Sequence, residues 1–499
     1  MELTQIFGLI PEVRPPTEKK LDFNTKLKWT LVVLISFFIL ANVSLFALSA
    51  NALQRFEYLA VILGTDFGSI ISLGIGPIVM ASIILQLLTG AGIINIDLTS
   101  VEGKKFFQGL QKILVFFFIL FESTIYVMMQ GLQAMPGFAW LVILQLIIGG
   151  IAIFYMDDLM HKWGFGSGVS LFIAAGVAWR LIASAFQFVD VNGKNCLLDF
   201  TNTACSGKVL VLVQSIINKY PIEFMSALAA ILATVIIFLA VVWAQSLKVE
   251  IPLSFGRIRG YGMKWPLQFF YASNVPVILV AALVANVQLF GGLIESAASP
   301  CLVVQDNLIQ NATDMLNSTV NTATANACTG GAKIASYFTF LGRFSQGQPI
   351  SGLAFWVGST DIVDLFIRGG FMWTYLLQGF IHVLFFVLLS AVFSVFWVKT
   401  SGMDAKAQAH KIAASGLQMA GFRQDERILE SVLERYIMPL TVMGGAAVGL
   451  LASLTDLMGA LVGGTAILLV IMITFQFYQN IAQQHASDMN PAIKKFMGG

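Results

Sequence analysis

The chain has 499 residues, of which 57% are hydrophobic and 11% are charged, and its formal net charge is +2. Soluble domains are about half apolar and about a quarter charged, so the composition excludes a soluble protein and indicates a membrane protein with several spans. The small net charge gives no reason to expect nucleic-acid binding through overall charge.

The first 26 residues carry mixed charges and lack an apolar core followed by a small-residue cleavage site, so they do not read as a cleavable signal peptide. We expect a cytoplasmic segment there, and the first apolar helix then serves as its own insertion signal.

Ten stretches approach the roughly 20 apolar residues that a membrane-spanning helix needs. They are Leu27–Leu48, Ile75–Gly92, Phe107–Gly131, Gly137–Met156, Gly164–Phe186, Phe224–Trp243, Val275–Gly292, Met372–Trp397, Leu440–Met458 and Leu461–Tyr478. Lys and Arg gather in the segments that face the cytoplasm if the N-terminus lies inside, which predicts that both termini are cytoplasmic. The ninth and tenth spans nearly touch, so they are predicted to form an antiparallel pair with a very short turn.

The second span, within LGIGPIVMASIILQLL (Leu73–Leu88), has an unusual start. Gly74, Gly76 and Pro77 crowd it, and Pro is tolerated in the first helical turn because that N–H is unpaired anyway. The pattern predicts a half-length helix that begins inside the membrane after irregular backbone. Lipid does not tolerate irregular backbone, so this stretch should be enclosed by protein and line a cavity.

A similar interruption at Pro276 opens the seventh span, which suggests two halves of five helices related by inverted symmetry. The expected divisions are an N-terminal segment 1–26, an N-terminal half 27–205, a C-terminal half 206–479, cytoplasmic loops 247–272 and 398–438, an external loop 293–370 and a cytoplasmic tail 480–499. The loop 398–438 is predicted to be helical over Asp404–Met419 and Glu426–Tyr436, and the external loop to be partly disordered over Gln310–Gly331.

All four cysteines fall on the predicted external side, as do two N-x-S/T sequons that begin at Asn311 and Asn317. Four cysteines allow three pairings. The favoured one joins neighbours within one loop, with free thiols as the alternative: Cys196 with Cys205, and Cys301 with Cys328.

The predicted spans contain few ionisable residues, chiefly Glu122, Arg180 and His382. Ion-coupled transporters usually need buried carboxylates or proton relays. The sequence also shows no phosphate-binding loop, metal-ligand spacing or protease motif, so no cofactor, metal or enzymatic activity is expected. These observations favour a protein that forms a passage through the membrane, with a secondary transporter built from inverted repeats as the alternative.

Short motifs follow one another along nearly the whole chain. They include Pro11-Glu-Val13, Leu27-Lys-Trp29, the Leu73–Leu88 stretch, Phe107-Gln-Gly109, Gly164–Gly168, Val249–Pro252, Gly256–Gly260, Ser273–Pro276, Gly421-Phe-Arg423, Arg435-Tyr-Ile437 and Gly463-Gly-Thr465. In this order they resemble SecY, the pore-forming subunit of the Sec protein translocon, in its archaeal form.

The resemblance implies an all-α polytopic membrane protein with ten transmembrane helices in two pseudo-symmetric inverted halves around a central hourglass pore. It implies a channel that translocates unfolded secretory polypeptides and releases transmembrane segments laterally into lipid. The implied location is the archaeal plasma membrane.

The family's pore ring maps onto six branched apolar residues: Ile75, Val79, Val169, Ile173, Ile278 and Leu469. Such a ring excludes ions by dewetting and yields to a passing chain. Ordinary helix packing is the alternative for each residue taken alone.

The family's plug maps onto residues 56–64, FEYLAVILG, through Phe56, Tyr58, Leu59 and Ile62, where a surface loop is the alternative. The lateral gate maps onto helices two and three against seven and eight. Its candidate polar contacts are Gln86, Glu122 and Asn286, with helix packing as the alternative role of Asn286.

Four arginines in the cytoplasmic loops map onto the family's ribosome-binding surface: Arg257, Arg259, Arg423 and Arg427. Arg clusters suit ribosomal RNA phosphates, although the same charges could serve topology alone. The resemblance also implies small partner subunits of the SecE (gamma) and Sec-beta types, the ribosome with its nascent chain, signal peptides and the lipid bilayer.

Overall fold

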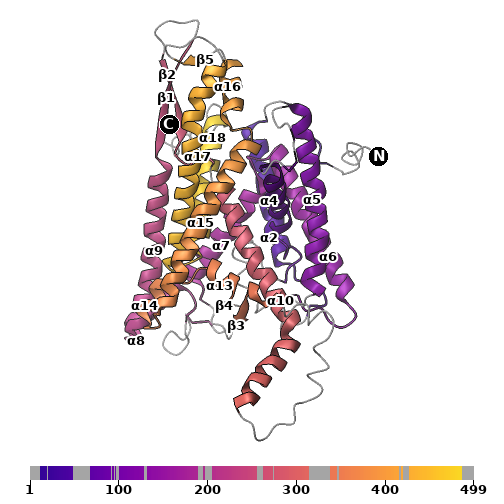
Figure 1. Ribbon diagram of the computed structural model, residues 1–499, viewed down its shortest axis with the longest axis vertical. Helices are drawn as coiled ribbons and strands as arrows, with labels where there is room; N and C mark the ends of the chain where they lie inside the picture. The colour runs from indigo at the N-terminus through magenta and orange to yellow at the C-terminus, as the bar shows by residue number, and fades with distance from the viewer. Residues whose placement is uncertain are drawn as a thin grey trace.

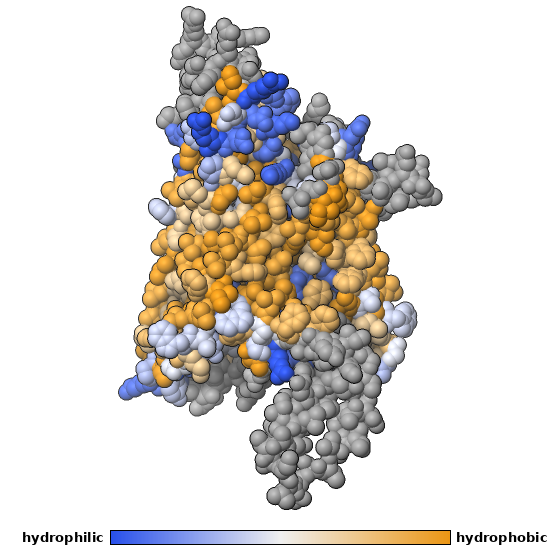
Figure 2. Space-filling model, viewed as in Figure 1, coloured by the Kyte–Doolittle hydropathy of each residue, from blue (hydrophilic) through white to orange (hydrophobic). Residues whose placement is uncertain are grey.

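A computed structural model of the chain describes residues 12–18, 21–48, 68–90, 93–94, 96, 100–128, 132–188, 195–196, 205–255, 262–272, 275–313, 338–345, 348–414, 417–419 and 426–485. Within these residues, nine helices are long and apolar enough to cross a membrane. Figure 2 shows an apolar belt across the face in view, with hydrophilic residues gathered above and below it. The predicted fold class, a helical polytopic membrane protein, is confirmed.

The long helices are α2 (Phe23–Asn42), α5 (Val101–Met128), α6 (Ala139–Trp163), α7 (Gly168–Phe186), α9 (Pro221–Gln245), α10 (Val275–Thr313), α15 (Trp373–Thr400), α17 (Glu426–Leu457) and α18 (Gly464–His485). The remaining predicted span is α4 (Gly76–Gly90), which has only 15 residues. Each of the ten predicted stretches therefore coincides with a helix, and the second is half-length as expected.

Shorter elements lie between and beyond these helices. They are α8 (Lys208–Asn218), η2 (Thr339–Leu341), α13 (Leu353–Val357), α14 (Ile362–Ile367), α16 (Ala405–Ala414), β1 (Lys248–Phe255), β2 (Gly262–Gln268), β3 (Arg343–Ser345), β4 (Gln348–Ser351) and β5 (Leu417–Met419). The antiparallel sheet β2-β1-β5 pairs Ile251 with Trp265 and Leu253 with Met419. This sheet and α16 project from one end of the bundle (Figure 1).

Helix α10 occupies the middle of the bundle. Of its apolar window, 78% is buried, against 17% for α2, so α10 is enclosed by protein while α2 mostly faces outward. Figure 1 shows α10 running between α4, α5 and α6 on one side and α9, α15 and α17 on the other. Apolar side chains from both sides join one core cluster, which includes Phe37, Leu146, Leu279, Phe386 and Leu468.

Two long predicted features differ from the structure. Helix α10 does not end at Gly292 but continues to Thr313. The predicted cytoplasmic helix at Glu426 is not separate from the ninth span, because α17 runs through both with Pro439 inside it. Apolar window length set the predicted ends, whereas helical hydrogen bonding continues past the apolar window in both cases.

The predicted helix Asp404–Met419 is also wrong at its C-terminal end. Helix α16 stops at Ala414, and Leu417–Met419 forms strand β5 against β1. A strand partner that lies far away in the sequence decides this conformation, which local propensity does not reveal.

The predicted short turn between the ninth and tenth spans is confirmed. Helix α17 ends at Leu457 and α18 begins at Gly464, with Gly459 at φ +63° in the turn. The Thr465 N–H donates to Asp456 Oδ1 at 2.6 Å, so the last turn of one helix caps the next.

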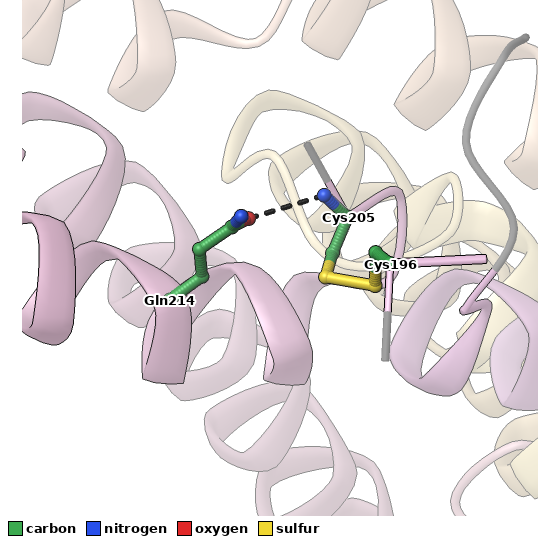
Figure 3. The surroundings of a disulfide bond; sticks show 3 residues. All are labelled: Cys196, Cys205 and Gln214. Atoms are coloured by element: carbon green, nitrogen blue, oxygen red, sulfur yellow. Dashed lines mark hydrogen bonds between the residues drawn. A yellow bond between two sulfur atoms is a disulfide. The ribbon is translucent and has the colours of Figure 1, made fainter. Parts of the chain in front are cut away.

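The predicted disulfide between Cys196 and Cys205 is confirmed, with Cα atoms 5.4 Å apart (Figure 3). The Cys205 N–H donates to Gln214 Oε1 on α8 at 3.1 Å, which ties the closed loop to the next helix. Cys328 lies outside the described residues, so its pairing with Cys301 stays a prediction.

Candidate functional site

The segment before α4 is irregular backbone that the rest of the protein encloses. Ile71 and Leu73 are completely buried, and Gly74 adopts φ +55°, which a residue with a side chain rarely tolerates. The Gly68 N–H donates to the Ser72 hydroxyl at 2.8 Å, and the Ile70 N–H donates to the Val43 carbonyl at 2.9 Å. The backbone polar groups are thus satisfied without water or lipid, as the sequence predicted for a helix that begins inside the membrane.

This irregular start places the first turns of α4 against α7, α10 and α18. Five of the six predicted ring residues surround one small space there: Ile75, Val79, Ile173, Ile278 and Leu469. The space has a volume of about 10 Å³. A cavity of this size holds at most about one water molecule, and its branched apolar walls offer that water no hydrogen bonds. We call this region the waist.

Val169, the sixth predicted residue, is not among the residues that line the waist. It lies one turn before Ile173 on α7, and its N–H donates to Asp157 Oδ1 at 2.9 Å, so it helps to begin that helix. Its role in the ring stays a prediction.

Three small residues complete the wall of the waist, and the sequence reasoning did not include them. They are Gly76, Ala281 and Ala282. Their small side chains let α4 and α10 approach closely. The signal that could have found them is the spacing of Ala281 and Ala282 one turn after Ile278, on the same face of α10.

The predicted gate residues are all buried, on three neighbouring helices. Gln86 on α4, Glu122 on α5 and Asn286 on α10 have 3%, 2% and 7% of their surfaces exposed. The Asn286 amide donates to the carbonyl of Ala282 in its own helix, so this bond joins no two helices, and the gate role of Asn286 stays a prediction. Within the described residues, no side-chain hydrogen bond joins the three to one another.

Several of these buried polar atoms lack a partner. Within the described residues, Gln86 Oε1 and Glu122 Oε1 accept no hydrogen bond, and neither does Gln288 Oε1 on α10. An unpaired buried polar group costs about 1–3 kcal/mol. Sequence reasoning missed Gln288, although an amide inside an apolar span was the available signal. Helix α4, which carries Gln86, packs against α5, α10 and α15.

Several predicted site residues lie outside the described residues. These are the plug positions Phe56, Tyr58, Leu59 and Ile62, and the arginines Arg257, Arg259 and Arg423. Arg427 is described, and it is exposed in the first turn of α17. In the sequence, residues 256–261 stand between β1 and β2, and they lie outside the described residues.

Comparisons with known proteins agree along the whole chain. A family model described as SecY matches residues 69–478. The protein named "Protein translocase subunit SecY" from Methanothermobacter thermautotrophicus is 38% identical over 99% of this chain and 98% of its own length. The protein of the same name from Methanocaldococcus jannaschii is 34% identical, with 99% of each chain covered.

Solved structures show the same similarity in three dimensions. The one described as "The structure of a protein conducting channel" has a TM-score of 0.77 and 33% identity, covering 99% of this chain and 100% of the other. The one described as "Sec61 in the Canine ribosome-channel complex from the endoplasmic reticulum" has a TM-score of 0.73 and 32% identity, with the same coverage.

Proposed function

Because the chain belongs to the SecY family, we propose that it is the pore-forming subunit of a protein-conducting channel, with the waist as its barrier. The observation that carries this proposal is the small apolar space of about 10 Å³ where α4, α7, α10 and α18 meet. A polypeptide cannot pass a space of this size, so the waist must widen when a chain enters. Between passages, the branched walls make it unfavourable for water and ions to cross.

Lateral release of apolar segments follows from the seam that α4 forms with α10 and α15. A transmembrane segment gains free energy in lipid, whereas a charged residue at mid-helix costs about 2.5–3.5 kcal/mol. A channel that opens this seam lets the segment partition by its own composition. The unpaired oxygens of Gln86 and Glu122 support this proposal, because an opened seam would expose them to water.

We further propose an archaeal plasma membrane location with both termini cytoplasmic, supported by the excess of Lys and Arg in the predicted cytoplasmic segments. The related Sec61 lies in a ribosome-channel complex, which supports the ribosome as a partner of this chain. Small subunits of the SecE and Sec-beta types would clamp the two halves of the channel, and signal peptides would enter its lateral gate.

Reconstitution tests the function directly. The chain is purified with its small partner subunits, incorporated into liposomes and offered ribosomes that carry a secretory nascent chain. We expect the nascent chain to become protected from added protease and to crosslink to α4 and α10. Liposomes that protect no chain but take up a small solute saturably would support the transporter alternative instead.

A further inference from the structure

The motif Pro11-Glu-Val13 has no role in the proposed function, yet Glu12 and Val13 make several polar contacts with α5 and α6. The Glu12 carboxylate accepts a short hydrogen bond from Lys112 Nζ on α5. Its second oxygen lies 3.4 Å from Lys162 Nζ on α6. One carboxylate thus joins the lysines of two neighbouring helices, and the bond from Lys112 lowers the pKa of Glu12 below its ordinary value.

The backbone after Glu12 is bound to α6 as well. The Val13 N–H donates to Asp158 Oδ2 at 3.0 Å, and the Val13 carbonyl accepts from Lys162 Nζ at 2.7 Å. The Arg14 carbonyl accepts from the Trp163 indole N–H at 2.9 Å. Residues 12–14 therefore bridge α5 and the C-terminal end of α6, and we call them the strap.

Lys112 itself calls for an explanation, because it lies well inside the helix α5 and its side chain is only 21% exposed. A lysine inside a membrane span is costly unless it is paired or reaches water. Glu12 supplies the counter-charge, and its side chain is about half exposed at 51%. The pair is therefore a partly buried contact that fixes where α5 lies relative to the strap.

The residue before Lys112 on α5 makes a separate contact with the gate helix. Gln111 Nε2 donates to the Ser82 hydroxyl on α4 at 2.8 Å, and Ser82 donates in turn to the Ile78 carbonyl of its own helix at 2.9 Å. Helix α4 carries Val79 of the waist and Gln86 of the seam. Lys112 thus joins α5 to Glu12, and Gln111, its neighbour in the sequence, joins α5 to the gate helix α4.

We propose that the strap holds α5 against α6 and so keeps α4 seated on α10 and α15, with Glu12 as the positioning residue for the closed gate. The proposal rests on the proposed function, because opening of this gate is the event that the strap opposes. Loss of the Glu12–Lys112 pair leaves the waist side chains untouched but lets α4 move outward more readily.

The test compares Glu12→Gln, Lys112→Met and the double variant in the complete complex with its small subunits. Glu18→Gln is the matched control, since Glu18 lies in the same segment and has no partner among the described residues. The resting ion conductance in planar bilayers should rise about two- to five-fold in both single variants, as expected for a partly exposed ion pair. The double variant should conduct no more than the larger single one, because both changes remove the same contact.

Hydrogen exchange provides a readout that general destabilisation would not produce. In Glu12→Gln, amides of α4 and α5 should exchange faster while those of α15 and α17 stay unchanged. Conductance equal to that of Glu18→Gln, or faster exchange in all helices alike, would overturn the proposal. Faster exchange confined to α4 and α5 in a complex that translocates no polypeptide would leave the strap standing and refute the proposed function instead.

Discussion

At the scale of single residues, the waist depends on the shape of a few branched apolar side chains. Ile75, Val79 and Ile278 are each less than 10% exposed, yet they border a space of about 10 Å³ rather than filling it completely. Ordinary core packing leaves few voids. This small apolar gap lies between helices with interrupted starts. A reversible constriction needs such a gap, because its side chains must touch when it is closed and must repack little when it opens.

The double change Ile75→Gly and Val79→Gly tests this barrier. Removing each side chain takes away about 1.5–3 kcal/mol of hydrophobic free energy at the wall. Lowering the free-energy barrier to ions by this amount corresponds to at least about a ten-fold rise in ion conductance. Single-channel recording in planar bilayers measures this change. Leu87→Gly on the outer face of α4 carries the same backbone penalty without touching the waist, and an equal conductance in the two variants would refute the barrier.

At the scale of elements, the C-terminal half depends on the close contact of α15 and α17. Gly445 and Gly449 on α17 face Ser390 and Ser394 on α15. Small residues at such spacing let helix backbones approach closely in a membrane, where packing rather than the hydrophobic effect drives association. A Cβ added at Gly449 would lie 2.7 Å from the Phe386 carbonyl oxygen, which is too close for any real contact.

Gly449→Ala should therefore destabilise the protein by about 1–3 kcal/mol through overpacking. Thermal unfolding in detergent, followed by the circular dichroism of the helices, measures the loss. Gly370→Ala is the control, because a Cβ there would meet only Leu365 at 3.6 Å. If both variants unfold at the temperature of the parent protein, the contact between the two helices is looser than described.

At the scale of the whole molecule, charge and apolar surface are separated along one axis. The apolar belt in Figure 2 gives way to a hydrophilic end over the hairpin β1–β2 and α16. Arg257 and Arg259 belong to the connection of that hairpin. Two arginines this close in the sequence suit the phosphates of ribosomal RNA.

Changing Arg257 and Arg259 to Glu should weaken ribosome binding and flatten its salt dependence. Loss of two phosphate contacts reduces the slope of log affinity against log salt by about two. Cosedimentation of ribosomes with liposomes at several salt concentrations measures the slope. Lys399→Glu, in the last turn of α15, reverses a basic charge outside this connection, and an equal effect from it would mean that the two arginines act only through overall charge.

The sequence by itself determined the membrane class, the ten apolar stretches and the half-length second helix. It also favoured the Cys196–Cys205 pairing. These features follow from local rules: apolar length, the tolerance of Pro77 in a first turn, and cysteines within one short loop. The family resemblance added the assignment of the ring, which no local rule supplies.

Only the tertiary structure decided the features that depend on distant partners. Leu417–Met419 became a strand because β1 was available, and α10 continued past its apolar window to Thr313. Lys112 looked like an unexplained charge inside a span until Glu12, 100 residues away, lay beside it. Hydrogen bonds and ion pairs between remote segments are set by the packing of the helices, and hydropathy along the chain carries no information about them.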